Sequence, residues 1–267
     1  MGDVEDPDLI SDLPQSILES ILTRLPIRDA VRTSILSSKW RYRWTTLTHL
    51  VFDDKCVSDR PVVENCMIKF ITRALFLHQG PIHKFHLSTS YLQCCPDIDQ
   101  WILFLSRSDI KELVLELGEG EWFRVNLRIF VLKIPPLLVA MSVAMYLNDD
   151  IAECFEQSSS CNFIKFLGGV PRLERLAGHI YFTKYLSIGD YPGSQAITYS
   201  HLKIIELYQV SFEDMKEIRV VLRLITNSPN LKELRVSGLS TAVASAEALD
   251  LEFWAKDCPQ RLHIQTT

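Results

Sequence analysis

The sequence predicts an α/β chain in which three short helices precede an irregular array of strands and helices. Two observations predict this order. Apolar residues recur at helical spacing over residues 9–50, and a weak repeat with apolar residues at relative positions 0, 3 and 5 begins near residue 80. The composition agrees, because 267 residues that are 47% hydrophobic and 23% charged are typical of a globular chain and exclude disorder throughout.

Residues 9–50 are expected to form the three helices. The first lies between an N-cap at Asp12 and a stop at Pro26. The second is expected near residues 29–35, and the third near residues 37–47. The apolar positions of the first helix are Ile17, Leu18, Ile21, Leu22 and Leu25. About 40 residues in three small helices make a poor independent core, so the surplus of large apolar groups indicates burial against something else.

The weak repeat predicts parallel strands that alternate with helices. Its copies start at residues 82, 110, 127, 202 and 231, and a degenerate copy at 173 has Gly178 at its third apolar position. A further strand is expected within residues 137–147, and helices over residues 64–77, 98–105 and 215–225. Most spacings are typical of one or two leucine-rich repeats, which form a solenoid, although the short step from 110 to 127 makes the array irregular.

Charge and composition exclude several classes of partner. The net charge of −5 provides no global positive field for nucleic acid or an anionic membrane. The most apolar stretch, residues 134–147, is shorter than the roughly 20 residues that span a bilayer. The acidic N-terminus is unlike a signal peptide, and none of the seven cysteines forms a C-x-x-C pair. We therefore expect an intracellular protein with reduced cysteines.

Other clusters of polar residues are expected to be structural. No phosphate-binding loop, nucleophile elbow or H-E-x-x-H motif is present, so no enzyme is expected. Residues of metal-binding type occur at His78, His83, His86, Cys94 and Cys95, but positions three apart on a strand face opposite sides. No metal site is therefore expected.

Three further groups have alternative interpretations. A nucleic-acid site is conceivable at Lys39, Trp40, Arg41, Arg43 and Trp44, but buried tryptophans and solvated cations are expected there. A loop holds Glu116, Glu119 and Glu121, which are expected to be solvated. A basic cradle for a small ligand on the repeat surface would consist of Lys203, Lys232 and Arg235.

An ordered set of short motifs lies in residues 9–50. The set comprises Leu13-Pro14, Ile21-Leu22, Leu25-Pro26, Ala30, the SILS run at 34–37, Lys39-Trp40-Arg41 and Trp44. Together these motifs resemble a plant F-box. The segments FIKFLGGVP (163–171), NSPNLKEL (227–234) and WILFLSRSDIKELVLEL (101–117) are similar to plant F-box proteins with FBD and leucine-rich repeats.

The resemblance implies a substrate-recognition adaptor of an SCF-type cullin–RING ubiquitin ligase, a non-catalytic subunit in the nucleus or cytoplasm. The F-box would bind a Skp-type adaptor and through it a cullin, and the repeats would bind an unknown target protein. No cofactor, metal, nucleic acid or membrane is expected as a partner. The expected adaptor-binding positions are Leu13, Pro14, Ile17, Ile21, Leu22, Leu25, Ala30, Ile35, Leu36 and Trp40. The sequence does not sort them into core and interface, and Trp40 is the expected anchor by residue type.

The predicted organisation has five parts. Residues 1–8 form a flexible acidic tail, 9–50 the F-box, 51–80 a linker and the first helix of the repeat region, and 81–240 degenerate leucine-rich repeats. Residues 241–267 form a C-terminal remnant, because Phe253-Trp254 and Cys258 look like the approach to an FBD that is expected to be missing or vestigial. Two alternatives stay open: a repeat scaffold without a ubiquitin-ligase role, or a degenerate copy of the family.

Overall fold

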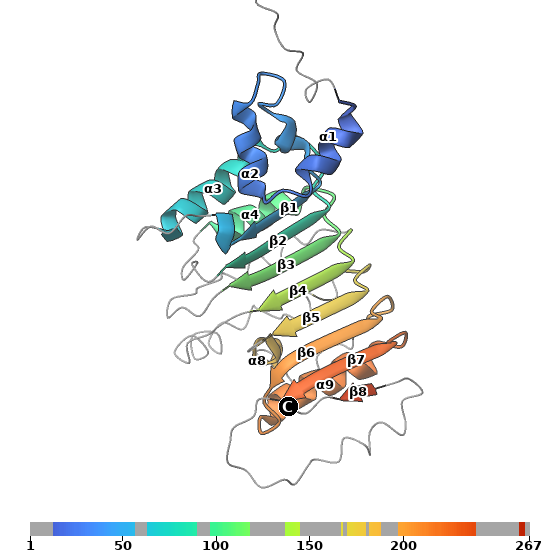
Figure 1. Ribbon diagram of the computed structural model, residues 1–267. Coiled ribbons are helices and arrows are strands. Elements are labelled where there is room, and N and C mark those ends of the chain that lie inside the picture. The colour runs from blue at the N-terminus through green and yellow to red at the C-terminus, as the bar shows by residue number, and fades with distance from the viewer. Residues whose placement is uncertain are drawn as a thin grey trace, which may run out of the picture.

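A parallel β-sheet of eight strands in chain order forms the body of the protein. The computed structural model describes residues 13–56, 63–89, 97–117, 137–144, 167, 170–179, 182–187, 197–238 and 262–264. All seven neighbouring pairs of strands are parallel, so the sheet grows in one direction, away from the N-terminal helices (Figure 1). The strands are β1 (His49–Asp53), β2 (Lys84–Thr89), β3 (Glu112–Leu117), β4 (Ala140–Ala144), β5 (Arg175–His179), β6 (Ile204–Val210), β7 (Glu233–Gly238) and β8 (Leu262–Ile264).

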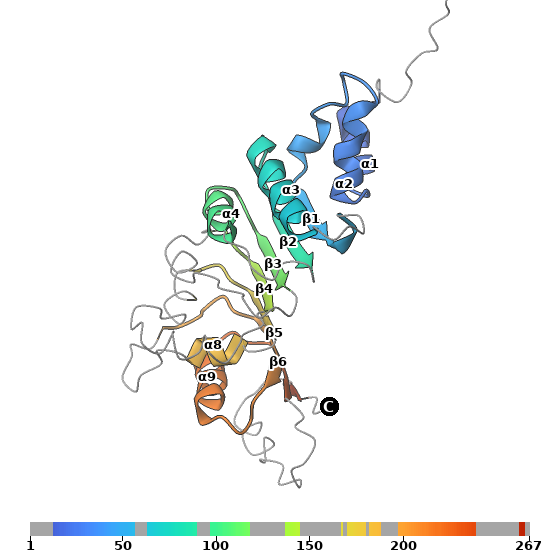
Figure 2. The same cartoon turned by 90° about the vertical axis from the view of Figure 1, so that its left-hand side faces the viewer.

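The described helices cover one face of this sheet, and along most of the sheet's length none of them lies on the other, open face (Figure 2). The covering helices are α3 (Val63–Leu77), α4 (Ile98–Leu105), α8 (Phe182–Ser187) and α9 (Met215–Thr226). The helices predicted at residues 64–77, 98–105 and 215–225 are confirmed by α3, α4 and α9. The α9 helix begins at Asp214, whose side chain accepts a hydrogen bond from the Lys216 amide and so caps the helix.

The apolar positions of the repeat lie side by side across the sheet. One ladder consists of Leu50, Phe85, Leu113, Met141, Leu176, Ile205 and Leu234, and the next of Phe52, Leu87, Leu115, Val143, Gly178, Leu207 and Val236. All of these residues are buried. Strands are therefore confirmed for the copies at 82, 110, 173, 202 and 231, and β4 for the segment 137–147. The copy at 127 lies outside the described residues, and β4 pairs directly with β3.

The missing apolar residue of the degenerate copy has a packing reason. The inward position of β5 at Gly178 is occupied from the side by the ring of Phe182, which is 1% exposed. A Cβ atom at Gly178 would overlap the Cδ1 atom of that ring. The phenylalanine at the start of α8 thus fills the volume that a leucine fills in the neighbouring strands.

Restoring the repeat pattern at this position should therefore destabilise the protein. We expect Gly178→Leu to lower the free energy of unfolding by about 2 kcal/mol or more, because a second large side chain cannot share the site. Urea denaturation checks the expected loss. The double variant Gly178→Leu/Phe182→Ala should recover part of it, and strict additivity of the two losses would contradict this explanation.

The N-terminal unit, residues 13–50, has two α-helices rather than three. They are α1 (Gln15–Leu22) and α2 (Ile27–Arg32), and the turns η1 (Thr33–Ile35) and η2 (Arg43–Thr46) follow. The expected third α-helix is wrong, because residues 38–47 form turns and the single 3₁₀ turn η2. The first helix starts after Pro14, and Asp12 lies outside the described residues.

The N-terminal unit is joined to the sheet without a linker. The predicted boundary between residues 50 and 51 falls inside β1, which pairs with β2 along its whole length. The Thr48 carbonyl accepts hydrogen bonds from the amides of His83 and Lys84 at 2.8 and 3.1 Å. The same pair of hydrogen bonds to one carbonyl recurs from each strand to the next as far as Lys203. One apolar core runs from Leu18 to Val236. The surplus apolar groups of residues 9–50 are thus partly buried against the protein's own sheet.

A histidine at the end of α3 fixes this joint. His78 Nε2 lies 2.8 Å from the Leu47 carbonyl, and the Gly80 amide donates to His78 Nδ1. These two bonds require a neutral ring that carries its proton on Nε2. Burial lowers the pKa of His78, which favours the same neutral form. His78 is therefore a structural residue in the described fold.

Candidate functional site

The first helix, α1, is apolar on two sides. Leu18 and Leu22 are four residues apart and lie in the core, each 1% exposed. Ile17 and Ile21 are also four residues apart, yet they are 45% and 39% exposed. One apolar side of the helix therefore packs against the protein, and the other faces solvent.

The ten residues expected to bind an adaptor separate into two groups. Leu22, Ala30 and Trp40 are buried, and Leu13 is half-buried against the core. The exposed members are Pro14, Ile17, Ile21, Leu25, Ile35 and Leu36. Trp40, expected as the anchor, is only 4% exposed and belongs to the same core as Trp44. Its large ring fills the small unit from within.

The turns after α2 present the most exposed apolar side chains of the unit. Ile35 is 86% exposed, Leu36 64% and Tyr42 60%. We name the six side chains Ile17, Ile21, Leu25, Ile35, Leu36 and Tyr42 the exposed apolar set. Side chains of this size gathered at one end of a protein, around a core that is already complete, are typical of a protein–protein interface.

The N-terminal unit is also basic. Arg24, Arg32, Lys39 and Arg41 are exposed, whereas the unit has few carboxylates. Arg32 lies 3.8 Å from Asp29, and both side chains are more than half exposed, so water weakens this ion pair. Because Trp40 and Trp44 are buried, neither ring is available to stack on a nucleic-acid base. The cations instead favour an acidic protein surface near the exposed apolar set.

The open face of the sheet contains a buried carboxylate held by two arginines. The Glu206 side chain is 4% exposed on β6. Its Oε2 atom accepts from Nε and Nη2 of Arg175 at 3.1 and 2.7 Å, and its Oε1 atom accepts from Nη1 of Arg235 at 2.9 Å. Arg235 also contacts Glu233 at 2.5 Å. The hydrogen bond to Glu206 raises the pKa of Arg175, so the guanidinium stays charged.

The predicted basic cradle is only partly available. Arg235 is engaged by Glu206 and Glu233, and Lys203 Nζ lies 2.9 Å from Glu174 Oε2. Lys232 forms no ion pair with any residue that the structure describes. The three cations do not point into one common site on the open face. Lys203 and Lys232 lie instead at the edge of the sheet, just before β6 and β7, whereas Arg235 lies on its open face beside Glu206.

A second buried carboxylate, Glu217 on α9, joins three elements. Its Oε2 atom accepts hydrogen bonds from Thr183 Oγ1 on α8 and from the Ser211 amide, the latter at 3.2 Å. Glu217 is 5% exposed, and this burial raises the pKa of its carboxyl, with the two hydrogen bonds acting in the opposite direction. Glu217 holds α8 and α9 together, and the charges of Asp214 and Lys184 act on its carboxyl with smaller effect.

The raised pKa of Glu217 has a testable consequence for stability. A carboxyl with a raised folded-state pKa stabilises the fold below its unfolded value, near 4.5, and this contribution is lost as the pH rises through the folded value. Glu217→Gln removes the titration and keeps an oxygen that can accept both hydrogen bonds. We therefore expect the free energy of unfolding of Glu217→Gln, relative to wild type, to increase between pH 4.5 and pH 8.

Urea denaturation of both proteins across this pH range measures that difference. A difference that stays flat with pH would contradict the assignment. Glu217→Ala provides the contrast, because it leaves the Thr183 hydroxyl and the Ser211 amide without their acceptor. It should cost about 1–3 kcal/mol.

The remaining candidate groups do not assemble into a reactive site among the described residues. No group of three or more histidine, cysteine or acidic side chains there is placed to hold a metal ion, and Cys94 and Cys95 lie outside these residues. Burial raises the pKa of the Cys56 thiol to about 11, which disfavours the reactive thiolate. Glu116 lies on β3, and Glu119 and Glu121 are outside the described part. No described helix is long and apolar enough to cross a membrane.

Comparison with known proteins gives one domain match and several relatives. The F-box domain family matches residues 10–51. An F-box/FBD/LRR-repeat protein of Arabidopsis thaliana is 51% identical over 320 aligned positions, which include 87% of this chain and 76% of the relative. Because this alignment is longer than the chain itself, the relative contains segments between its matched parts that have no counterpart here.

Two further relatives from the same plant are more distant. A putative F-box/FBD/LRR-repeat protein is 28% identical over 250 positions, with 88% of this chain and 54% of the relative covered. Another F-box/FBD/LRR-repeat protein is 27% identical over 264 positions, with 89% of this chain and 55% of the relative covered. The chain thus spans about half the length of these two relatives.

Proposed function

The chain belongs to the plant F-box/FBD/LRR-repeat family, and from this premise we propose that it is the substrate-recognition adaptor of an SCF-type cullin–RING ubiquitin ligase. Residues 9–50 dock on a Skp-type adaptor and through it on a cullin. Residues 81–240 form a degenerate leucine-rich-repeat solenoid that holds the target protein. The role is non-catalytic, because the chain positions a target for ubiquitin transfer by its partners.

One observation carries the proposal: the N-terminal unit exposes large apolar side chains although its own core is filled. Ile35 and Leu36 are 86% and 64% exposed, while Trp40 and Leu22 complete the interior. Burying one such side chain in an interface stabilises a complex by about 1.5–3 kcal/mol. Several together, with the surrounding cations, suffice for a stable and specific interface with an acidic, apolar partner.

The solenoid assignment is supported by the regular register of the sheet. Parallel strands in chain order, apolar ladders at the same two positions of each strand, and helices on one face are typical of stacked repeats. Once per strand, a backbone carbonyl accepts two hydrogen bonds from the amides of the next repeat. These carbonyls belong to Thr48, His83, Lys111, Val139, Glu174 and Lys203. The open face of such an array is free to contact a target.

The proposal is tested with the purified full chain and a purified Skp-type adaptor. We expect a 1:1 complex in size-exclusion chromatography and a submicromolar dissociation constant in calorimetry, and incorporation into a complex reconstituted with the cullin. A chain that is folded by circular dichroism but binds no Skp-type adaptor would refute the proposal. It would leave a repeat scaffold or a degenerate family copy as the explanation.

A further inference from the structure

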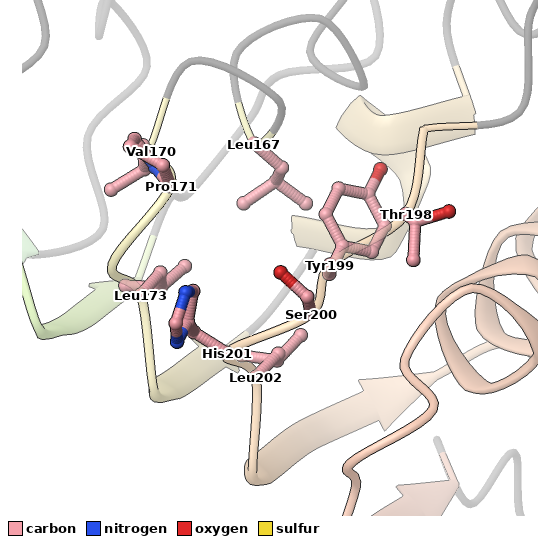
Figure 3. Close-up of a pocket in the computed structure, with 9 residues that line it drawn as sticks. All are labelled: Leu167, Val170, Pro171, Leu173, Thr198, Tyr199, Ser200, His201 and Leu202. Atoms are coloured by element: carbon pink, nitrogen blue, oxygen red, sulfur yellow. The ribbon is translucent and has the colours of Figure 1, made fainter.

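A pocket opens at the edge of the sheet where β5 and β6 begin. It has a volume of about 150 Å³ and lies between the loop before β5 and the loop before β6 (Figure 3). Leu167, Leu173 and Leu202 give it an apolar lining, and Ser200 and His201 add polar atoms. An engineered apolar cavity of about this volume binds a benzene-sized molecule. The pocket is therefore large enough for one leucine or phenylalanine side chain.

Basic residues are next in sequence to the residues that line this pocket. Arg172 is next to the lining residue Leu173, His201 lines the pocket, and Lys203 follows the lining residue Leu202. Arg172, His201 and Lys232 are exposed. Neither Arg172 nor Lys232 forms an ion pair within the part of the chain that the structure describes. These loops thus carry exposed cations outside the ion pairs of the described residues.

Glu174 is a carboxylate that lies beside one of these cations. Glu174 accepts a hydrogen bond from Lys203 at 2.9 Å, and this bond, with smaller contributions from His201 and Lys232, lowers the pKa of Glu174. The Lys203 amide donates to the Glu174 carbonyl and the Lys232 amide donates to the Lys203 carbonyl, each at 2.8 Å, so these three residues are neighbours where their strands begin. Among the described residues at this edge, Lys203 has an ion-pair partner and Arg172 and Lys232 have none. This edge therefore presents uncompensated positive charge on a chain whose total charge is −5.

We propose that this pocket and the cations Arg172, Lys203 and Lys232, together the β5–β6 edge site, bind an acidic segment of the target protein. One apolar side chain of that segment enters the pocket, and its neighbouring carboxylates meet the cations. This inference rests on the proposed adaptor function, because it names the chemistry of the target. The arginines of the open face contribute less, since Glu206 already engages both of them.

The test uses the full chain and fluorescein-labelled, end-blocked hexapeptides, with binding followed by fluorescence anisotropy. The first peptide carries a leucine between acidic residues, the second has alanine in place of leucine, and the third has glutamine in place of each acidic residue. We expect the first to bind about tenfold or more tightly than the second, because the leucine is buried. We also expect it to bind more tightly than the third, with an advantage that shrinks as salt is added.

Two variants locate the binding. Ser200→Leu fills the pocket and should abolish the preference for leucine over alanine while it keeps the preference for acidic peptides. Lys203→Gln/Lys232→Gln should reduce the preference for acidic peptides at least threefold. The control Arg219→Gln removes a positive charge from the exposed surface of α9. It should leave both peptide preferences, for leucine and for acidic residues, unchanged.

The outcomes separate this inference from the adaptor proposal. Equal binding of the three peptides, or unchanged selectivity of Ser200→Leu, would overturn the edge site. The same samples are titrated with the Skp-type adaptor. A chain that binds the adaptor but shows no peptide selectivity refutes only the edge site, and a chain that binds peptide but no adaptor refutes only the adaptor role.

Discussion

Replacing Ile35 and Leu36 together by aspartate should weaken binding of a Skp-type adaptor at least 100-fold without lowering the free energy of unfolding. The two side chains are 86% and 64% exposed, so the folded monomer loses little when they become polar. In the complex the same variant forfeits the burial of two large apolar groups. It also forces two carboxylates into an apolar interface. Calorimetric titration and urea denaturation measure the two quantities on one sample.

A matched control is available on the neighbouring helix. Phe76 on α3 is 84% exposed, which is nearly the exposure of Ile35, but it lies outside the N-terminal unit. Phe76→Asp should therefore bind the adaptor with the affinity of wild type. A second variant, Ile35→Ser/Leu36→Ser, removes apolar surface without adding negative charge. If the Phe76 variant lost as much adaptor affinity, any added surface charge would weaken binding. That result would contradict the assignment of Ile35 and Leu36 to the adaptor interface.

The sequence favours Trp40 as the docking anchor, and the structure places it in the core. Trp40→Ala should lower the free energy of unfolding by about 3–5 kcal/mol, because a large buried ring leaves a cavity. The fraction that stays folded should bind the adaptor with nearly unchanged affinity, since the ring does not face solvent. Trp40→Phe should restore most of the stability.

This result distinguishes a core residue from an anchor. The measurements are a urea titration and an adaptor titration well below the unfolding midpoint. If Trp40→Ala were as stable as wild type but failed to bind, Trp40 would be a contact residue and the assignment to the core would be wrong. Together the two variants separate apolar groups that make the fold from apolar groups that make the complex.

Sequence periodicity correctly predicted the helices and strands that have a single apolar face packed against the core. The pattern over residues 215–225 leaves α9 a single apolar side, and the repeat at positions 0, 3 and 5 places one set of residues against the helices. The N-terminal unit is different, because α1 has two apolar sides. Spacing shows that Ile17 and Ile21 share a side, but only the fold decides that Leu18 and Leu22 go inside.

Other features depend on contacts between residues far apart in sequence. Glu206 is buried because Arg175 and Arg235, about thirty residues away on either side, supply its hydrogen bonds. The pocket combines Leu167 with residues of the loop before β6, which no local pattern links. β1 was missed because its alternation of exposed and buried residues follows the F-box motifs directly, and its partner strand starts 35 residues after it.

The hydrogen bonds at Thr48 connect the N-terminal unit rigidly to the sheet, so the protein holds its two ends at a fixed distance. Parallel strands lie about 4.8 Å apart, so the seven steps from β1 to β8 amount to roughly 34 Å. A target protein bound at β5 and β6 is then held at a constant distance and orientation from the N-terminal unit that binds the adaptor. Within the proposed ligase, this distance would determine which lysines of the target protein come within reach of the ubiquitin donor. Lengthening the array by one strand would bring a different set of target lysines into reach.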